Sequence, residues 1–325
     1  MIAATARAWS VVRPRTIDHA VAALAHAGPT GMPHAGGTDL MVRVKEGRCE
    51  PGTIVDLSLV DELRGIELGD ETIVIGAARP MADLLADPRV TTSFPALADA
   101  IRVVGSVQIR HRASLGGNIA NASPAADTVP VLVALGAVAR IAGPAGRRSA
   151  PVASLLAGPG RTTLAPAEII TAIEIPTAPR SASAYLRLTR RTSVDLALIS
   201  AAVVLPEREP PRVAFGAAGP VIERNAAVED ELAVGWPRAE APGVASRDRG
   251  DAGRDTESGA GNPLPFSDGD LDRAARAAVE SVRPISDVRA GERYRRAMAG
   301  VLLVRAVRVA LGRVGSESDG EGGPA

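Results

Sequence analysis

The sequence contains very little cysteine, lysine or aromatic side chain, and these shortages exclude several classes of function. Cys49 is the only cysteine among 325 residues, so this chain alone cannot form a disulfide, an iron–sulfur cluster or a cysteine zinc site. Lys45, the only lysine, is followed by Glu46. No GxxxxGK[ST] loop therefore exists, which excludes nucleotide hydrolysis of the P-loop type. Aromatic residues make up 2% of the chain, too few for a platform on which bases stack.

The sequence also lacks net charge, because 37 Lys and Arg residues balance 37 Asp and Glu residues. A neutral chain does not hold a polyanion by bulk electrostatics, so we expect no nucleic-acid partner. The four histidines are scattered and show no HExxH spacing, so no metal site is predicted. No apolar run reaches the roughly 18 residues of a membrane span, and the N-terminus has no signal-peptide core. These features predict a cytoplasmic protein.

Residue spacing predicts a fold that mixes helices and strands. Short β-branched or alternating runs predict strands at 11–14, 53–57, 66–68, 72–75, 137–142, 168–175 and 213–215. Helical spacing predicts helices at 17–27, 40–44, 77–85, 94–104, 127–135, 223–234, 270–282 and 292–311, the first with Thr16 as its N-cap. Residues 185–191 and 196–205 fit either a strand or a helix, and a loop rich in Gly and Pro is expected between 142 and 168.

Composition divides the chain into two parts that meet near residue 178. Residues 236–268 contain mostly Arg, Asp, Gly, Ala and Ser. Such a segment buries too little apolar surface to offset the entropy of ordering, so it is predicted to be a flexible insertion. Residues 313–325 are predicted to be a disordered tail. No GxGxxG sequence follows a strand, so a Rossmann dinucleotide site is not predicted.

Two pairs of adjacent glycines are the strongest candidates for a ligand site. Gly36-Gly37 lies in AGGTDL (35–40), and Gly116-Gly117 follows the basic segment RHR (110–112). Adjacent glycines permit positive φ and let a ligand approach the backbone closely, and successive N–H groups in such a turn can hold an anion. Each pair alone could simply form a turn. Together, two cradles of phosphate size suit a pyrophosphate.

Several charged or aromatic residues near these turns have a structural and a functional interpretation. Asp127 could accept a bond from a ligand hydroxyl, but its spacing favours a cap on the helix that follows. The arginines of segments 110–112 and 187–191 are expected at the surface, the second group near Asp195. Tyr185 is expected in the core rather than against a ring. No Ser-His-Asp or Cys-His arrangement is present, so no catalytic residue is assigned.

The glycine motifs resemble those of the FAD-binding medium subunit of the molybdenum hydroxylases, the xanthine dehydrogenase and aerobic carbon monoxide dehydrogenase family. The resemblance rests on AGGTDL (35–40) and SVQIRHRASLGGNIANASPAADTVPVLVALGA (106–137). It continues through LAPAEIITAIEIP (164–176), YLRLTRRTSVDLALISAAV (185–203) and ISDVRAGERYRRAMAGVLLVRAV (285–307). Nearly the whole chain is covered, apart from residues 236–268 and the tail.

The resemblance implies an α+β fold. It consists of a two-lobed FAD-binding domain of the vanillyl-alcohol-oxidase-like (PCMH) type at 1–178, and a smaller α+β flavoprotein domain at 179–312. It also implies FAD-binding residues. The implied pyrophosphate loops are Ala35, Gly36, Gly37, Thr38, Asp39 and Leu40, and Ser114, Leu115, Gly116, Gly117 and Asn118. Asp127 corresponds to the family's flavin-binding aspartate, and Val104, Ile170 and Arg187 fall where side chains near the adenine or isoalloxazine lie.

The implied function is electron transfer inside a larger complex. A large partner chain would carry molybdopterin, a small one two [2Fe–2S] clusters, and FAD here would pass electrons to NAD⁺, a quinone or oxygen. Thr38-Asp39 replaces the His-Ser that is usual in carbon monoxide dehydrogenase chains, which favours a xanthine or aldehyde type. The extra cluster cysteines of benzoyl-CoA reductase relatives are absent. The alternatives are a stand-alone flavoenzyme of the same fold, or a non-catalytic assembly or regulatory protein.

Overall fold

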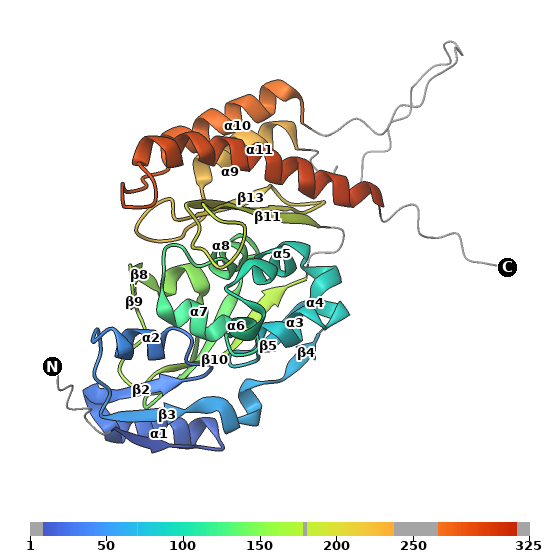
Figure 1. Ribbon diagram of the computed structural model, residues 1–325. Coiled ribbons are helices and arrows are strands. Elements are labelled where there is room, and N and C mark those ends of the chain that lie inside the picture. Colours follow the sequence, from blue (N-terminus) through green and yellow to red (C-terminus); the bar gives the residue numbers. More distant parts are fainter. Residues whose placement is uncertain (1–8, 70, 178–180, 237–265, 317–325) are drawn as a thin grey trace, which may run out of the picture.

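The N-terminal part of the chain forms a small parallel sheet with a helix beside it. A computed structural model describes residues 9–69, 71–177, 181–236 and 266–316 (Figure 1). The strands pair in parallel in the order β1 (Ser10–Val12), β3 (Thr53–Asp56), β2 (Gly31–His34). Between β1 and β2 lies α1 (Ile17–Ala27), whose first turn is capped by Thr16, since the Thr16 side chain accepts the N–H of His19. This confirms the predicted strand, helix and cap.

A five-stranded antiparallel sheet forms the centre of the molecule. Its order is β4 (Ile66–Leu68), β5 (Thr72–Gly76), β10 (Ile169–Pro176), β6 (Val138–Gly143), β7 (Gly146–Pro151). Six helices connect β5 to β6: α3 (Met81–Leu85), α4 (Pro88–Ser93), α5 (Pro95–Val103), α6 (Val107–Arg110), α7 (Leu115–Asn121) and α8 (Thr128–Ala134). A separate ladder joins β8 (Leu156–Gly158) to β9 (Arg161–Thr162).

The C-terminal part is a three-stranded antiparallel sheet between two layers of helices. Strands β11 (Ala182–Leu188), β12 (Ile199–Leu205) and β13 (Arg212–Gly216) pair in this order. On one side lie α9 (Ala226–Gly235), α10 (Asp268–Ser281) and α11 (Glu292–Ser316), and on the other lie α5 and α8 of the preceding part (Figure 1). Since every residue of β12 is buried, this sheet is covered on both faces.

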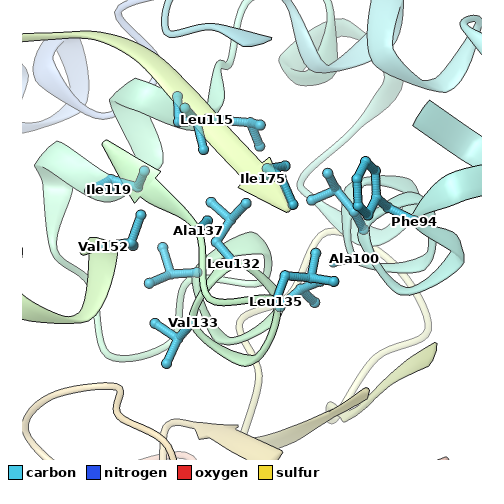
Figure 2. Packing of buried hydrophobic residues seen from close by; sticks show 14 of the residues in the cluster. Phe94, Ala100, Leu115, Ile119, Leu132, Val133, Leu135, Ala137, Val152 and Ile175 are labelled. Carbon is cyan, nitrogen blue, oxygen red and sulfur yellow. The ribbon is translucent and has the colours of Figure 1, made fainter. Parts of the chain in front are cut away.

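Helix α8 is the centre of the apolar core that both parts share. Every residue of α8 is buried, and the helix packs on β12 and β13. Figure 2 shows Leu132 and Val133 of this helix beside Ile119 of α7. Tyr185 of β11 belongs to the same cluster. Residues of α8 and of the C-terminal sheet therefore belong to one continuous apolar core.

Two expectations from the sequence were wrong for identifiable reasons, and one open alternative is decided. The helix predicted to begin at residue 77 begins at Met81, because a residue that precedes proline, here Pro80, disfavours helical backbone. The loop expected between 142 and 168 contains β7, β8 and β9. Strand β7 has the polar sequence GRRSAP and an exposed surface, so it has no apolar alternation to reveal it. Residues 185–188 and 199–205, left open between helix and strand, are strands.

The predicted insertion at 236–268 has structured ends. Trp236 and Phe266 stack with ring centroids 5.4 Å apart, Phe266 is buried, and the Trp236 indole N–H donates to the carbonyl of Pro206 at 3.0 Å. Both ends therefore belong to the core. Residues 237–265 and 317–325, where flexibility was predicted, lie outside the described residues, and α11 continues to Ser316, into the predicted tail. Over the described ranges, no helix is both long and apolar enough to cross a membrane.

An aspartate organises the loop that joins α10 to α11. Asp287 accepts hydrogen bonds from the backbone N–H groups of Arg289 and Ala290, and the buried Arg295 guanidinium donates to it at 2.6 Å. Burial alone would raise the pKa of Asp287, but the two backbone N–H groups and Arg295 lower it to about 2. The ionised carboxylate therefore stabilises the folded loop at neutral pH.

We predict that Asp287→Asn lowers the free energy of unfolding by about 2 kcal/mol at pH 7, because it leaves a buried arginine without its anionic partner. A lowered pKa stabilises the fold above the unfolded value of 3.8, and this contribution is lost as pH falls from there towards 2. Denaturant unfolding of both proteins at several pH values between 7 and 2 measures the difference. A difference that stays constant over this range would contradict the assignment.

Candidate functional site

The two glycine motifs line one cavity. The cavity has a volume of about 810 Å³, which lies within the range of small-molecule and cofactor sites. Three parts of the chain form its walls: the segment from Met32 to Arg43, the segment from Val104 to Asp127, and a loop of the C-terminal sheet at Val194, Asp195 and Leu196. The sequence prediction that the two glycine turns lie together is therefore confirmed.

The first glycine loop presents unused backbone donors. Over the described residues, no protein group accepts a hydrogen bond from the N–H of Gly36, Gly37 or Thr38. Gly37 has a φ of +73°, a conformation that L side chains rarely adopt, and a Cβ there would lie 2.3 Å from Nε2 of His34. Consecutive free N–H groups in such a turn suit an anion such as a phosphate or pyrophosphate.

The second glycine loop has a different construction. Gly116 donates to the carbonyl of Ala77 at 3.0 Å, and Asn118 donates to the carbonyl of Ser114. Gly117 donates to Oγ of Ser114 at 3.2 Å, which caps α7. A Cβ on Gly116 would collide with Ala77, whereas a Cβ on Gly117 would meet only Oγ of Ser114 at 3.3 Å. Gly116 is thus required by packing, and of the two glycines only Gly117 lines the cavity.

Two contacts hold the loops against each other. The backbone of Gly36 lies so close to Arg112 that a Cβ would be 1.7 Å from the Arg112 carbonyl oxygen. Across the cavity wall, Asn121 donates from Nδ2 to Oδ1 of Asp39 at 2.9 Å. Asp39 is accessible, but the concave wall displaces water around it and raises its pKa, while nearby Arg43 opposes that rise.

Asp127 is paired with the C-terminal sheet instead of capping its helix. It occupies the N-cap position of α8, yet its side chain makes no capping bond. The Tyr185 hydroxyl donates to Oδ1 at 2.7 Å, and Nη1 of Arg187 donates to Oδ1 at 3.1 Å and to Oδ2 at 2.9 Å. The predicted cap was therefore wrong, because two donors on β11 bind the carboxylate. Burial raises the pKa of Asp127, and Arg187 opposes this rise.

The arginine-rich segment is divided between the interior and the surface. The Arg187 side chain is only 6% exposed, so the prediction of a surface position was wrong for this residue. Arg190 and Arg191 are exposed, and their backbone N–H groups donate to Asp195. Tyr185 is buried, as predicted. Its pKa is well above the ordinary value because of burial and the nearby Asp127 carboxylate.

Most of the predicted FAD-binding residues line the cavity. Those that do so are Ala35, Gly36, Gly37, Thr38, Asp39, Leu40, Val104, Ser114, Gly117, Asn118 and Asp127. The four that do not are Leu115, Gly116, Ile170 and Arg187. Leu115 is in the apolar core (Figure 2), and Ile170 pairs with Ile141 inside the central sheet. Arg187 does not line the cavity itself but binds Asp127, which does.

Sequence reasoning missed several residues of the cavity. Asn121 lies three positions after Asn118, so helical spacing alone places both on one face of α7. Val194 and Leu196 are apolar yet 62% and 52% exposed, and two such residues in a polar loop are a recognisable signal of a ligand surface. His34 also lines the cavity. A Cβ on Gly37 would lie 2.3 Å from Nε2 of His34, a closeness that the sequence does not reveal.

Comparison with known proteins identifies the family to which this site belongs. Residues 6–178 match the FAD binding domain in molybdopterin dehydrogenase. This chain belongs to that family. The carbon monoxide dehydrogenase medium chain of Hydrogenophaga pseudoflava is 30% identical over 92% of this chain and 96% of its own length. A putative xanthine dehydrogenase FAD-binding subunit of Escherichia coli is 32% identical over 58% of this chain and 66% of its own.

The fold agrees with that of a solved relative. The reconstituted carbon monoxide dehydrogenase of Oligotropha carboxidovorans contains a chain that is 28% identical, with a TM-score of 0.82 over 94% of this chain and 98% of that one. The predicted α+β fold class is confirmed, and the chain is an FAD-binding oxidoreductase of the molybdenum hydroxylase family. The free amides of the first loop and the open face of Gly117 fit that cofactor.

We predict that Gly36→Ala lowers the free energy of unfolding by about 1–3 kcal/mol, because the new methyl group forces the two loops apart. Gly117→Ala is the matched control, and we expect it to change stability by less than about 0.5 kcal/mol, since its methyl group meets one flexible hydroxyl. Thermal or denaturant unfolding of both variants in the absence of flavin measures the difference. Equal losses in the two variants would contradict the loop contact.

Proposed function

We propose that this chain is the FAD-carrying electron-transfer subunit of a molybdopterin-dependent hydroxylase complex. The observation that carries the proposal is the single cavity walled by two glycine loops, one of them with unused N–H groups. It is supported by relatives that are named as medium chains or FAD-binding subunits along most of this sequence. The metal centres would lie on other chains, which agrees with the single cysteine.

The residues of this chain would bind and orient the flavin. FAD supplies the redox chemistry when it is bound, and the protein supplies binding, orientation and electrostatics. The N–H groups of Gly36, Gly37 and Thr38 would donate to the pyrophosphate. Val194 and Leu196, which line the cavity, would offer an apolar surface to a ring. No acid or base of this chain is assigned to the reaction, because electron transfer through a flavin does not need one.

The partners follow from this division of labour. Electrons would arrive from [2Fe–2S] clusters on a small chain, after substrate is hydroxylated at a molybdopterin centre on a large chain. They would leave to an external acceptor, NAD⁺, a quinone or oxygen. Thr38-Asp39 in the first loop supports a complex of the xanthine or aldehyde type.

We predict that Gly117→Asp lowers the affinity for FAD at least tenfold, because it places a carboxylate in the cavity opposite an anionic ligand. Its fold should survive, since a Cβ on Gly117 would meet one side-chain atom, Oγ of Ser114 at 3.3 Å, and no backbone atom. Gly65→Asp is the control, at an exposed glycine with nothing near its Cβ position and outside the cavity. Fluorescence titration of each folded apoprotein with FAD gives the affinities. Unchanged affinity in Gly117→Asp would mean that the second loop is misassigned.

We also predict that two further chains co-purify with the tagged chain from its native cells. The three-chain complex should contain molybdenum and four iron atoms, the iron content of two [2Fe–2S] clusters. Affinity purification followed by mass spectrometry and metal analysis tests this. A monomeric flavoprotein that turns over its own substrate would overturn the subunit proposal in favour of a stand-alone flavoenzyme. A folded chain that binds neither FAD nor partners would favour the non-catalytic alternative.

A further inference from the structure

The FAD cavity is completed by the C-terminal sheet. Val194, Asp195 and Leu196, from the loop between β11 and β12, line the cavity. Strand β11 leads directly into this loop, and its residues Tyr185 and Arg187 bind Asp127 on the opposite side of the domain boundary. The loop after β11 therefore supplies one wall of the cavity, and β11 itself fixes a residue of another wall.

Asp127 is buried, and both of its oxygens are engaged by β11. Oδ1 accepts two hydrogen bonds, from Tyr185 and Arg187, and Oδ2 accepts one, from Arg187. A carboxylate oxygen accepts two such bonds, so Oδ2 retains one position for a ligand hydroxyl. An ionised carboxylate in this buried place needs a cationic partner, and Arg187 is the cation that supplies it. Without Arg187, neither the charge nor the direction of the free oxygen position is fixed.

We propose that Tyr185 and Arg187 are positioning residues for FAD binding. Through them, the C-terminal domain sets the FAD affinity of a cavity that is built mainly by the N-terminal domain. They hold the Asp127 carboxylate ionised and aimed into the cavity, so closure of the domain boundary and binding of the cofactor favour each other. This inference rests on the proposed FAD site.

A second ion pair crosses the same boundary and provides a matched control. The Arg313 guanidinium of α11 binds Asp99 of α5 at 2.8 Å and donates to the carbonyl of Ser183 on β11. Neither Asp99 nor Arg313 lines the cavity. Asp99 also accepts the backbone N–H of Tyr185 at 3.4 Å, so only Arg313 is replaced in the control. Replacing Arg313 loosens the boundary while Asp99 stays in place, so this variant separates general stability from cofactor affinity.

The test measures FAD affinity and apoprotein unfolding in parallel. We expect Arg187→Met to weaken FAD binding at least tenfold and Arg187→Lys, which keeps the cation, to restore most of the affinity. Tyr185→Phe should weaken binding severalfold, because one donor to Oδ1 is lost. Arg313→Met should lower the melting temperature of the apoprotein but change the dissociation constant for FAD by less than threefold.

Several results would overturn the proposal. Equal losses of affinity in Arg187→Met and Arg313→Met would assign both pairs to stability alone, as would an unchanged affinity in folded Arg187→Met. Failure of Arg187→Lys to recover affinity would show that the cation is not what matters. If Arg187→Met does not fold, Tyr185→Phe, which keeps the ring, decides the matter by its affinity. Wild-type protein that binds no FAD would instead refute the proposed function itself.

Discussion

The close approach of Gly36 to the carbonyl of Arg112 is the contact on which the site depends. It leaves no room for a side chain, and it brings the turn after β2 against the segment between α6 and α7. Because Gly36 and Arg112 are 76 residues apart in sequence, no local preference could join them. Once they are joined, the free N–H groups of the first loop and the open face of Gly117 line the same cavity.

The second requirement is that the C-terminal sheet packs on α8. This helix is buried throughout, and Asp127 occupies its N-cap position. The packing of β12 and β13 on the helix therefore also fixes the position of the Asp127 carboxylate. Tyr185 and Arg187 then bind it from β11. The N-terminal part of the chain and the C-terminal sheet therefore both contribute to the cavity, which explains why residues as distant in sequence as Thr38 and Leu196 line it together.

The features that could be predicted from the sequence are those that depend on local residue chemistry or on a recognisable motif. Thr16 as a cap, the strands at 66–68 and 72–75, the helices after residue 268 and the two glycine loops were all recognisable from spacing, and the family followed from the motifs. The sequence could not predict what depends on tertiary partners. Asp127 was expected to cap a helix and Arg187 to lie at the surface. Instead, the Arg187 guanidinium of β11 donates a hydrogen bond to the Asp127 carboxylate. Gly116 resembled a ligand glycine, but packing on Ala77 explains it.

The flavin content of the purified chain is the most direct test of the central claim, that this cavity holds FAD. Heat would release any non-covalent flavin, and chromatography would identify and quantify it against the protein concentration. We predict one FAD per chain, either as purified or after addition of FAD to the folded apoprotein. A stably folded chain that contains no flavin, and binds none when FAD is added, would contradict it.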